Sequence, residues 1–355
     1  MALLPSFLQI VMGIVLLFVG GELFVSGATA LALLLGISQV VIGLTVVSLG
    51  TSAPELFVSL SSILQGGDGI ATGNVVGSNI FNVLVVLGLS AVVVPLRVQS
   101  RLVRRDVPLL LGVSMAVWGM ASAGRLTWQA GLALLVGLVI NLVWEARTAG
   151  EDPDEVGDFE PNDRKGPKVA AVFLAAGLVL LVFGSQLLVQ GAITAATALG
   201  VSQTIIGLTI VAAGTSMPEL VTSVVAAYRG KVDLAIGNVV GSNLLNIFLI
   251  LGICSFVSGG DGLVVDPLIV NRDLPIMVVT TLACLPIFWT RGVITRFEGA
   301  LLVLLYSLYL AEQVLTSTAS SMSDEFRLVA LVAVLPLVMV FLVWQTLRWR
   351  QERRA

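Results

Sequence analysis

Histidine is absent from this chain of 355 residues. That absence excludes histidine-ligated metal sites, Ser-His catalytic triads and histidine proton relays. Only two cysteines are present, Cys254 and Cys284, and both lie within apolar stretches. We interpret them as small buried apolar residues rather than as a disulfide or a metal-binding pair. Charge is also scarce: charged residues make up 12% of the chain and the net charge is −3, which gives no indication of a nucleic-acid partner.

The chain is instead rich in apolar residues. They make up 57% of the chain, and the mean hydropathy is +1.02. A chain this apolar cannot cover itself with polar side chains, so we expect a lipid bilayer around it. The first apolar stretch runs well past the length of a signal-peptide core, so we expect no removable leader. A membrane-spanning helix needs about 20 mostly apolar residues. Such stretches occur at 5–32, 37–64, 70–95, 106–123, 127–147, 169–197, 201–228, 233–257, 273–290, 296–315 and 327–347.

The basic residues predict the orientation of these eleven spans. With the N-terminus outside, 16 of the 19 basic residues fall on the cytoplasmic side. The three left outside are Arg125, Arg272 and Arg327. Positive charge gathers on the cytoplasmic side of membrane proteins. We therefore predict a multi-pass protein of the inner cell membrane, with its N-terminus outside and its C-terminus in the cytoplasm.

The chain repeats itself with an offset of 164 residues. GISQVVIGLTVVSLGTSAPELFVS at 36–59 returns as GVSQTIIGLTIVAAGTSMPELVTS at 200–223. GNVVGSNIFNVLVVLG at 73–88 returns as GNVVGSNLLNIFLILG at 237–252. The two pairs share 25 identities in 40 positions, and these include Gly, Asn, Pro and Glu. Two unrelated membrane segments would share Leu and Val by chance, because both are rich in these residues, but they would not share Gly, Asn, Pro and Glu at matching positions.

Each copy of the repeat holds five predicted spans, an odd number, so the second copy must enter the membrane from the opposite side. This is the inverted-repeat arrangement of secondary transporters, whose sites lie near the bilayer midplane. We therefore predict an all-α polytopic membrane protein built from two inverted five-helix repeats and one extra C-terminal span. The predicted parts are a first repeat at 1–147, an acidic cytoplasmic loop at 148–168, a second repeat at 169–316, and a last helix with a basic tail at 317–355.

Glu55 and Glu219 occupy equivalent positions inside apolar helices of the two copies. A carboxylate at membrane depth is costly and usually faces a cavity or an ion; the plain alternative is a protonated glutamate satisfied by a neighbouring helix. Further oxygen donors share the helix face of each glutamate at helical spacing. They are Ser48, Thr51 and Ser52 in the first copy, and Thr215 and Ser216, with Ala212 in place of a serine, in the second.

Pro54 and Pro218 precede the two glutamates. A proline within a helix has no N–H for the carbonyl four residues back, so the carbonyls of Gly50 and Gly214 should lose their partners. In lipid an unpaired carbonyl is tolerated only inside protein or at a cavity, where a cation is one natural partner. The alternative is a kink that serves packing alone.

The next helix of each copy adds amides and hydroxyls at spacing i, i+4, i+8. They are Asn74, Ser78 and Asn82, and Asn238, Ser242 and Asn246. Every candidate ligand is therefore oxygen, which favours calcium, magnesium, manganese or alkali ions over zinc or copper. Two carboxylates balance one divalent ion, and calcium accepts a flexible set of six to eight oxygens more readily than magnesium does.

The blocks GTSAPEL with GNVVGSNIFN, and GTSMPEL with GNVVGSNLLN, resemble the two alpha-repeats of the cation/calcium exchanger superfamily, specifically its prokaryotic sodium/calcium exchanger branch. The resemblance implies a central calcium site formed by Glu55, Glu219, Thr51 and Thr215. It also implies flanking sodium sites that add Ser48, Ser78, Ala212 and Ser242, with Asn82 and Asn246 between them. Some prokaryotic members carry Asp at the position of Asn246, which leaves the coupling here open. Proton/calcium members show a Gly-Asn-Glu motif that this chain lacks.

The function that follows is electrogenic exchange of calcium for sodium by alternating access, with both ions as substrates. We expect no enzymatic activity, no cofactor and no obligate protein partner. A proton/calcium antiporter, or an exchanger of magnesium or manganese, is the open alternative. A multi-subunit channel fits the internal repeat less well, and an intramembrane hydrolase lacks its catalytic residues.

Two further acidic features have weaker interpretations. The stretch EDPDEVGDFEPND at 151–163 partly matches a calcium-binding loop, but Val156 and Asp163 stand at positions where such a loop has a ligand and a glutamate. We therefore interpret it as a solvated linker. Glu22 aligns with Gln186 of the other copy and is a secondary candidate for the site.

Overall fold

Glycine and proline determine where the two longest helices begin and end. In the computed structural model, α1 (Leu3–Leu35) is followed by Gly36 with a φ of 66°. Helix α9 (Pro167–Ala198) begins at a proline and is followed by Gly200 with a φ of 81°. Glycine adopts these left-handed angles without steric cost because it has no Cβ. The two glycines are equivalent in the repeat, so both copies end their first helix in the same way.

The structure describes residues 3–148, 163–201, 206, 209–210, 212–289 and 292–317. The predicted eleventh span at 327–347, and nearly all of the acidic stretch at 151–163, lie outside these residues.

The remaining elements of the described residues are helices of 3 to 22 residues, π-helical turns, a 3-10 turn and two-residue strands. In the first half they are α2 (Gln39–Ile42), a π-turn (Gly43–Val47), α3 (Ser48–Thr51), α4 (Ala53–Leu64), α5 (Asp68–Phe81), a π-turn (Asn82–Val86), α6 (Leu87–Val93), β1 (Leu96–Arg97), a π-turn (Leu102–Asp106), α7 (Val107–Ala121), β2 (Arg125–Leu126) and α8 (Trp128–Thr148). In the second half they are α11 (Ala212–Gly214), α12 (Met217–Tyr228), α13 (Val232–Leu245), a π-turn (Asn246–Leu251), α14 (Gly252–Val257), a 3-10 turn (Gly259–Asp261), β3 (Leu263–Val264), a π-turn (Ile269–Asp273), α15 (Leu274–Trp289), β4 (Val293–Ile294) and α16 (Arg296–Ser317).

Seven helices among the described residues are long and apolar enough to cross a membrane. An eighth is formed if α2–α3 and α4 count as one span, bent by 45° at Ser52. The predicted span at 106–123 differs: its regular helix α7 has only 15 residues and follows a π-turn that carries Arg104, Arg105 and Asp106. The predicted span at 201–228 lies partly outside the described residues. The mostly helical, membrane-spanning character of the chain is confirmed.

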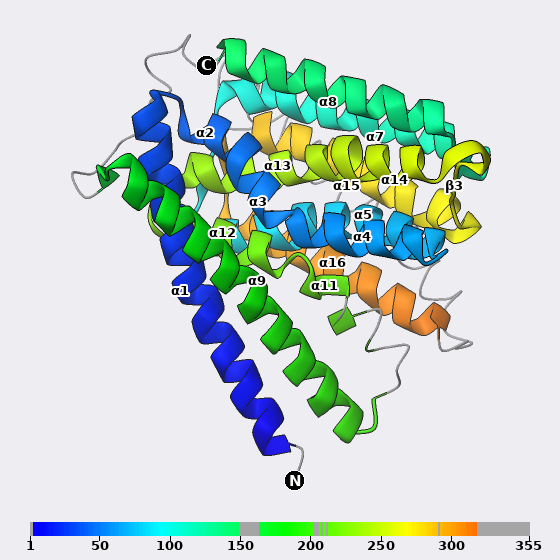
Figure 1. Ribbon diagram of the computed structural model, residues 1–355, viewed down its shortest axis with the longest axis horizontal. Helices are drawn as coiled ribbons and strands as arrows, with labels where there is room; N and C mark the ends of the chain where they lie inside the picture. Colours follow the sequence, from blue (N-terminus) through cyan, green and yellow to red (C-terminus); the bar gives the residue numbers. More distant parts are fainter. Residues whose placement is uncertain are drawn as a thin grey trace.

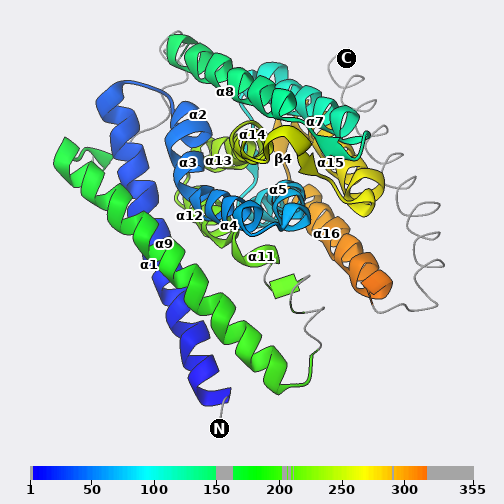
Figure 2. The same cartoon turned by 45° about the vertical axis from the view of Figure 1, so that its right-hand side comes forward.

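The helices differ sharply in how far they are buried. The most apolar stretches of Asp68–Val93 and Val232–Val257 are 83% buried, against 22% for those of α8 and α9. Figures 1 and 2 show the reason: α5 and α13 lie in the middle, with the α1–α9 pair on one side and α7 with α8 on the other. The motif-bearing helices of both repeats are therefore the centre of the protein.

Close backbone approach holds α1 against α9. A Cβ added to Gly20 would lie 2.8 Å from the Leu181 nitrogen, and one added to Gly27 would lie 2.7 Å from the Leu174 nitrogen. Glycines that allow such approach are typical of helix interfaces in lipid, where van der Waals packing replaces the hydrophobic effect. The two helices form a distinct pair in both views (Figures 1 and 2).

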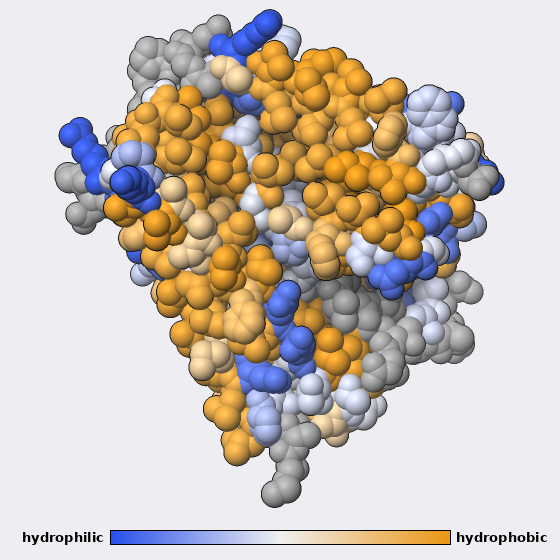
Figure 3. Space-filling model, in the orientation of Figure 1, coloured by the Kyte–Doolittle hydropathy of each residue, from blue (hydrophilic) through white to orange (hydrophobic). Residues whose placement is uncertain are grey.

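The outer surface is apolar where lipid is expected. Large apolar side chains such as Phe18, Val139 and Val179 are more than half exposed. Figure 3 shows apolar residues covering most of the face in view, with the hydrophilic ones gathered in a few patches. An aqueous solvent would penalise this surface, and a bilayer does not.

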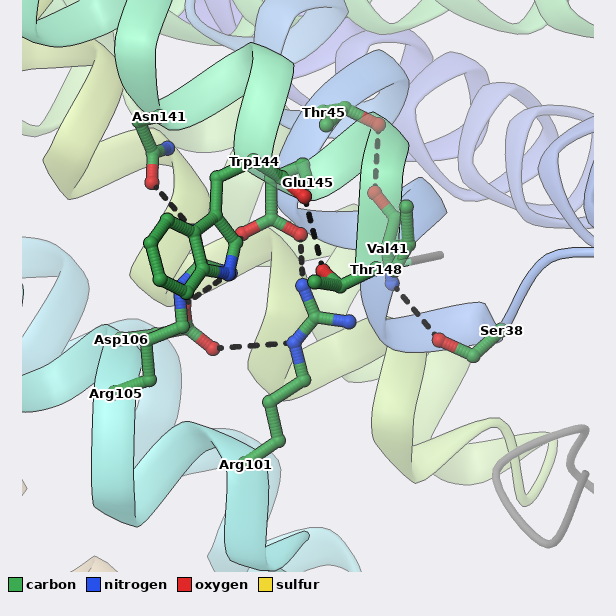
Figure 4. Close-up of polar contacts among 10 residues, drawn as sticks. All are labelled: Ser38, Val41, Thr45, Arg101, Arg105, Asp106, Asn141, Trp144, Glu145 and Thr148. Atoms are coloured by element: carbon green, nitrogen blue, oxygen red, sulfur yellow. Dashed lines mark hydrogen bonds and ion pairs between the residues drawn. The ribbon is translucent and has the colours of Figure 1, made fainter. Parts of the chain in front are cut away.

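A buried ion cluster fixes the start of α7 against the end of α8 (Figure 4). Glu145, whose side chain is 3% exposed, accepts hydrogen bonds from both Arg101 and Arg105. Arg105 also contacts Asp106 at 3.4 Å and lies over the Trp144 ring, 5.4 Å from its centroid. The grouping recurs 167 residues later, where Arg272 contacts Asp273 at 2.8 Å and Glu312 at 3.5 Å.

Two short antiparallel ladders join elements that are distant in sequence. Strand β1 pairs with β4, and β2 pairs with β3. Each ladder links one half of the chain to the other, next to the buried helices.

Candidate functional site

The two glutamates lie at breaks in their helices. Ser52 separates α3 from α4, and Ser216 precedes α12; both have φ and ψ values outside the helical range. Pro54 and Pro218 lie within the first two residues of the new helices, where a missing N–H costs nothing. Glu55 and Glu219 therefore lie in the first turn after each break, where the helix dipole favours a negative charge.

Both carbonyls predicted to lose a partner accept another hydrogen bond, and the Gly50 carbonyl accepts one from a backbone N–H at the C-terminal cap of α3. Gly214 accepts a hydrogen bond from the Ser185 hydroxyl of α9 at 2.6 Å. Neither carbonyl therefore needs the cation that the sequence had suggested as a substitute for its hydrogen-bond partner. Position 21, the repeat equivalent of Ser185, is a glycine and cannot do the same for Gly50.

Each carboxylate is bound by a serine from the other half of the chain. Ser216 donates to Oε1 of Glu55 at 2.8 Å, and Ser52 donates to Oε1 of Glu219 at 2.9 Å. Both glutamates are fully buried. Ser52 and Ser216, each predicted to share a helix face with the glutamate of its own copy, thus bind the glutamate of the other copy.

Asparagines of α5 and α13 hold the broken helices in place. The Asn74 amide donates to the Glu55 carbonyl at 3.3 Å and to Ser59 at 3.0 Å. Asn238 repeats this with the Glu219 carbonyl at 3.4 Å and with Ser223 at 2.9 Å.

The threonines close the same network from across the site. Thr215 donates to Oδ1 of Asn74 at 3.3 Å, and Thr51 donates to Oδ1 of Asn238 at 3.1 Å. Thr51 also lies 3.5 Å from the Ser242 hydroxyl. Each threonine therefore contacts the half of the chain to which it does not belong.

The other predicted hydroxyls lie around this core. Ser78 lies 3.1 Å from the Ser216 hydroxyl, and Ser48 donates to the Asn238 carbonyl at 3.1 Å and to the Gly43 carbonyl. Ala212, which has no hydroxyl, lies in α11 at the position equivalent to Ser48. The serine positions are thus not fully symmetric.

Four buried oxygen atoms at this site have no hydrogen-bond partner among the residues that the structure describes. They are Oε2 of Glu55, Oε2 of Glu219, Oδ1 of Asn82 and Oδ1 of Asn246. A buried acceptor without a partner costs about 1–3 kcal/mol, and more if it is charged. Carboxylate and amide oxygens are the ligand types that hard cations prefer.

Two residues that matter here were not among the predicted ligands. Asn79 and Asn243 are buried and bind the Asn246 and Asn82 amides, each at 3.0 Å. Both stand in the repeated GSN block, so the repeat alone could have identified them. The secondary candidate Glu22 forms an ion pair with Arg229, at the end of α12.

Comparisons with known proteins identify the family of the chain. The chain matches the family described as sodium/calcium exchanger protein over residues 5–146 and 169–315. Sodium/calcium exchanger MaX1 of Methanosarcina acetivorans is 34% identical over 343 residues, covering 86% of this chain and 97% of that protein. Inner membrane protein YrbG of Escherichia coli K12 is 33% identical over 315 residues, covering 84% and 95%.

A solved structure shows the same fold. The sodium-calcium exchanger NCX_Mj, soaked with Na+ and Sr2+, superposes with a TM-score of 0.75 at 31% identity, covering 87% of this chain and 98% of that one. With the family matched over both halves of the sequence, this chain belongs to the sodium/calcium exchanger family of membrane cation exchangers.

Proposed function

We propose that this protein is a secondary antiporter that exchanges calcium for sodium by alternating access. The observation that carries the proposal is the set of four buried, unpartnered oxygens on Glu55, Glu219, Asn82 and Asn246. Two carboxylates supply the charge that one divalent ion neutralises, and the amide oxygens complete a mixed and adaptable oxygen set. The chemistry suits calcium better than magnesium, which requires a rigid octahedron and gives up its water reluctantly.

The proposed sodium sites use the hydroxyls around the carboxylates. Thr51 lies 3.5 Å from Ser242. Ser78 contacts Ser216, which binds Glu55, and Thr215 contacts Asn74, which binds the Glu55 carbonyl. Hydroxyl and carboxylate oxygens are hard ligands, which suit pockets for alkali ions. The full proposed ligand set is Glu55, Glu219, Thr51, Thr215, Ser52, Ser216, Ser48, Ala212 (through its backbone), Ser78, Ser242, Asn82 and Asn246.

Coupling to sodium gives the cycle a net charge. Roughly three sodium ions against one calcium would carry about one charge across the membrane per cycle, worth roughly 2.3 kcal/mol per 100 mV. Proton coupling would instead have the two glutamates carry the protons, because no histidine is present. It would leave the surrounding hydroxyls without a transport role.

The proposed layout is two inverted repeats of five spans each, at 1–147 and 169–316, with a cytoplasmic loop at 148–168 between them and an extra helix at 317–355. The paired motifs support this, because equivalent residues of the two copies make equivalent hydrogen bonds around the site. The name of the Escherichia coli relative supports the inner membrane as the location. The proposed orientation has the N-terminus outside and the C-terminus in the cytoplasm.

The proposal is tested by radioactive calcium uptake into proteoliposomes that contain the purified chain. An opposing sodium gradient at fixed pH should drive calcium accumulation, and collapse of the sodium gradient should stop it. Uptake driven fully by a pH gradient in sodium-free medium would replace sodium with protons as the coupling ion. A linear conductance that does not saturate with calcium would favour a channel, and stronger uptake of magnesium or manganese would change the proposed substrate.

A further inference from the structure

Asn79 and Asn243 form a pair at the meeting of α5 and α13. Each donates its amide to the backbone carbonyl of the other, at 3.3 Å in both directions. The two residues are 1% exposed and occupy equivalent positions in the repeat. Asn79 also directs its amide nitrogen toward the Met277 sulfur at 3.6 Å.

These backbone contacts fix which way each side-chain amide points. A backbone carbonyl can only accept a hydrogen bond, so the NH2 group of each asparagine must face it. The Oδ1 atoms of Asn79 and Asn243 must then face away from those carbonyls. In that direction they accept hydrogen bonds from the amides of Asn246 and Asn82, each at 3.0 Å.

The orientation of Asn79 and Asn243 in turn fixes the orientation of the asparagine amides that they bind. Because Asn79 and Asn243 offer only an oxygen, Asn246 and Asn82 must each turn their NH2 group toward it. Their own Oδ1 atoms are thereby directed elsewhere, and these are the buried oxygens that have no hydrogen-bond partner. An amide turned the other way would present its NH2 group, and its partial positive charge, to a cation.

We propose that Asn79 and Asn243 are positioning residues that make Asn246 and Asn82 present oxygen, and not nitrogen, to the transported cation. The inference rests on the proposed function, since it assigns these two oxygens to the cation. Residues that orient a metal ligand in this way commonly affect affinity by 10- to 100-fold.

Each positioning residue orients an asparagine of the other half of the chain. Asn79 orients Asn246, which is 167 residues away, although Asn82 lies only one helical turn from Asn79 on the same helix. Likewise Asn243 orients Asn82 and not its own neighbour Asn246. A role limited to packing α5 against α13 would produce no such crossed dependence.

Double-mutant cycles on the purified full chain test this crossing. Calcium affinity is measured by titration calorimetry on Asn79→Leu, Asn246→Ala and Asn82→Ala, and on the two doubles that combine Asn79→Leu with either alanine. Asn79→Leu alone should weaken calcium binding by roughly tenfold or more. That loss should nearly vanish in the Asn246→Ala background, where no amide is left to orient, and persist in the Asn82→Ala background, the matched control.

The mirror cycle, with Asn243→Leu, should couple to Asn82→Ala and not to Asn246→Ala. If a leucine variant aggregates on size-exclusion chromatography, serine replaces leucine, because it also removes the orienting amide. Equal losses in both alanine backgrounds, or no loss with Asn79→Leu, would overturn the positioning role. Absence of calcium binding by the unmutated chain would instead overturn the proposed function.

Discussion

The Ser52 hydroxyl donates a hydrogen bond to Oε1 of Glu219 at 2.9 Å, although the two residues are 167 positions apart. Ser216 does the same for Glu55 at 2.8 Å. Each carboxylate thus gives one oxygen to a serine of the other half, and its Oε2 has no partner within the described part of the chain. The serines both hold the two halves together and set the direction of the open oxygens.

This relationship predicts the effect of removing either hydroxyl. Ser52→Ala and Ser216→Ala should each weaken calcium binding by about tenfold, because a supporting contact of a ligand carboxylate is lost. Titration calorimetry on purified protein measures the effect. Ser122→Ala is the matched control: this serine is exposed and donates to the Trp118 carbonyl, so its loss should change affinity by less than about twofold. Equal effects of all three substitutions would contradict the role of the serines.

The glutamates themselves should be indispensable. Glu55→Gln and Glu219→Gln should each abolish calcium uptake, since half of the charge that balances the ion is removed. Glutamine can still accept the serine hydrogen bond, so both variants should fold and elute as the wild type does. Glu22→Gln, which affects an ion pair with Arg229, should be much milder. Near-normal uptake in either site variant would remove that residue from the ligand set.

Membrane potential should change the rate of exchange. A cycle that moves about one net charge gains roughly 2.3 kcal/mol per 100 mV of favourable potential. Sodium-driven calcium flux in proteoliposomes should therefore increase when a potassium diffusion potential opposes the build-up of that charge, and fall when the potential is reversed. Flux that is independent of potential would show an electroneutral exchange.

Reporter fusions should reveal the orientation. A reporter after Ala355 and another in the 148–168 loop should both indicate the cytoplasm, whereas one near Gly260 should indicate the exterior. An external signal from the fusion after Ala355 would mean that the number of spans is even, with the last predicted span the first to be reconsidered.

The buried ion cluster at α7 and α8 should matter for stability and not for ion binding. Glu145→Gln removes the carboxylate shared by Arg101 and Arg105 and should destabilise the protein by about 3 kcal/mol, as expected for a broken buried ion pair. Thermal unfolding in detergent measures this loss, and calcium affinity of the folded protein should stay near wild type. Glu312→Gln should cost less, because Arg272 keeps its closer contact with Asp273. A change in calcium affinity as large as that of a site variant would contradict the structural role.

Sequence alone determined the class of the protein, and it predicted which polar residues gather around the two buried glutamates. Burial of charge in lipid is so costly that the position of Glu55 and Glu219 within apolar helices is enough to make them candidates for a functional site. The repeat supplied the matching serines, threonines and asparagines, and Pro54 and Pro218 predicted the helix breaks. These inferences can be made from sequence because each depends on local chemistry: a residue type, its spacing, and the solvent implied by its neighbours.

Only the tertiary structure decided which oxygen meets which partner. The pairing of Ser52 with Glu219, the Ser185 contact that satisfies the Gly214 carbonyl, and the amide chain through Asn79 all depend on how helices of the two halves pack. Spacing along one helix places side chains on a face, but it does not say what that face meets. A hydrogen bond forms only within about 3 Å and at a suitable angle, so contacts between residues more than a hundred positions apart are set by packing and not by the local sequence.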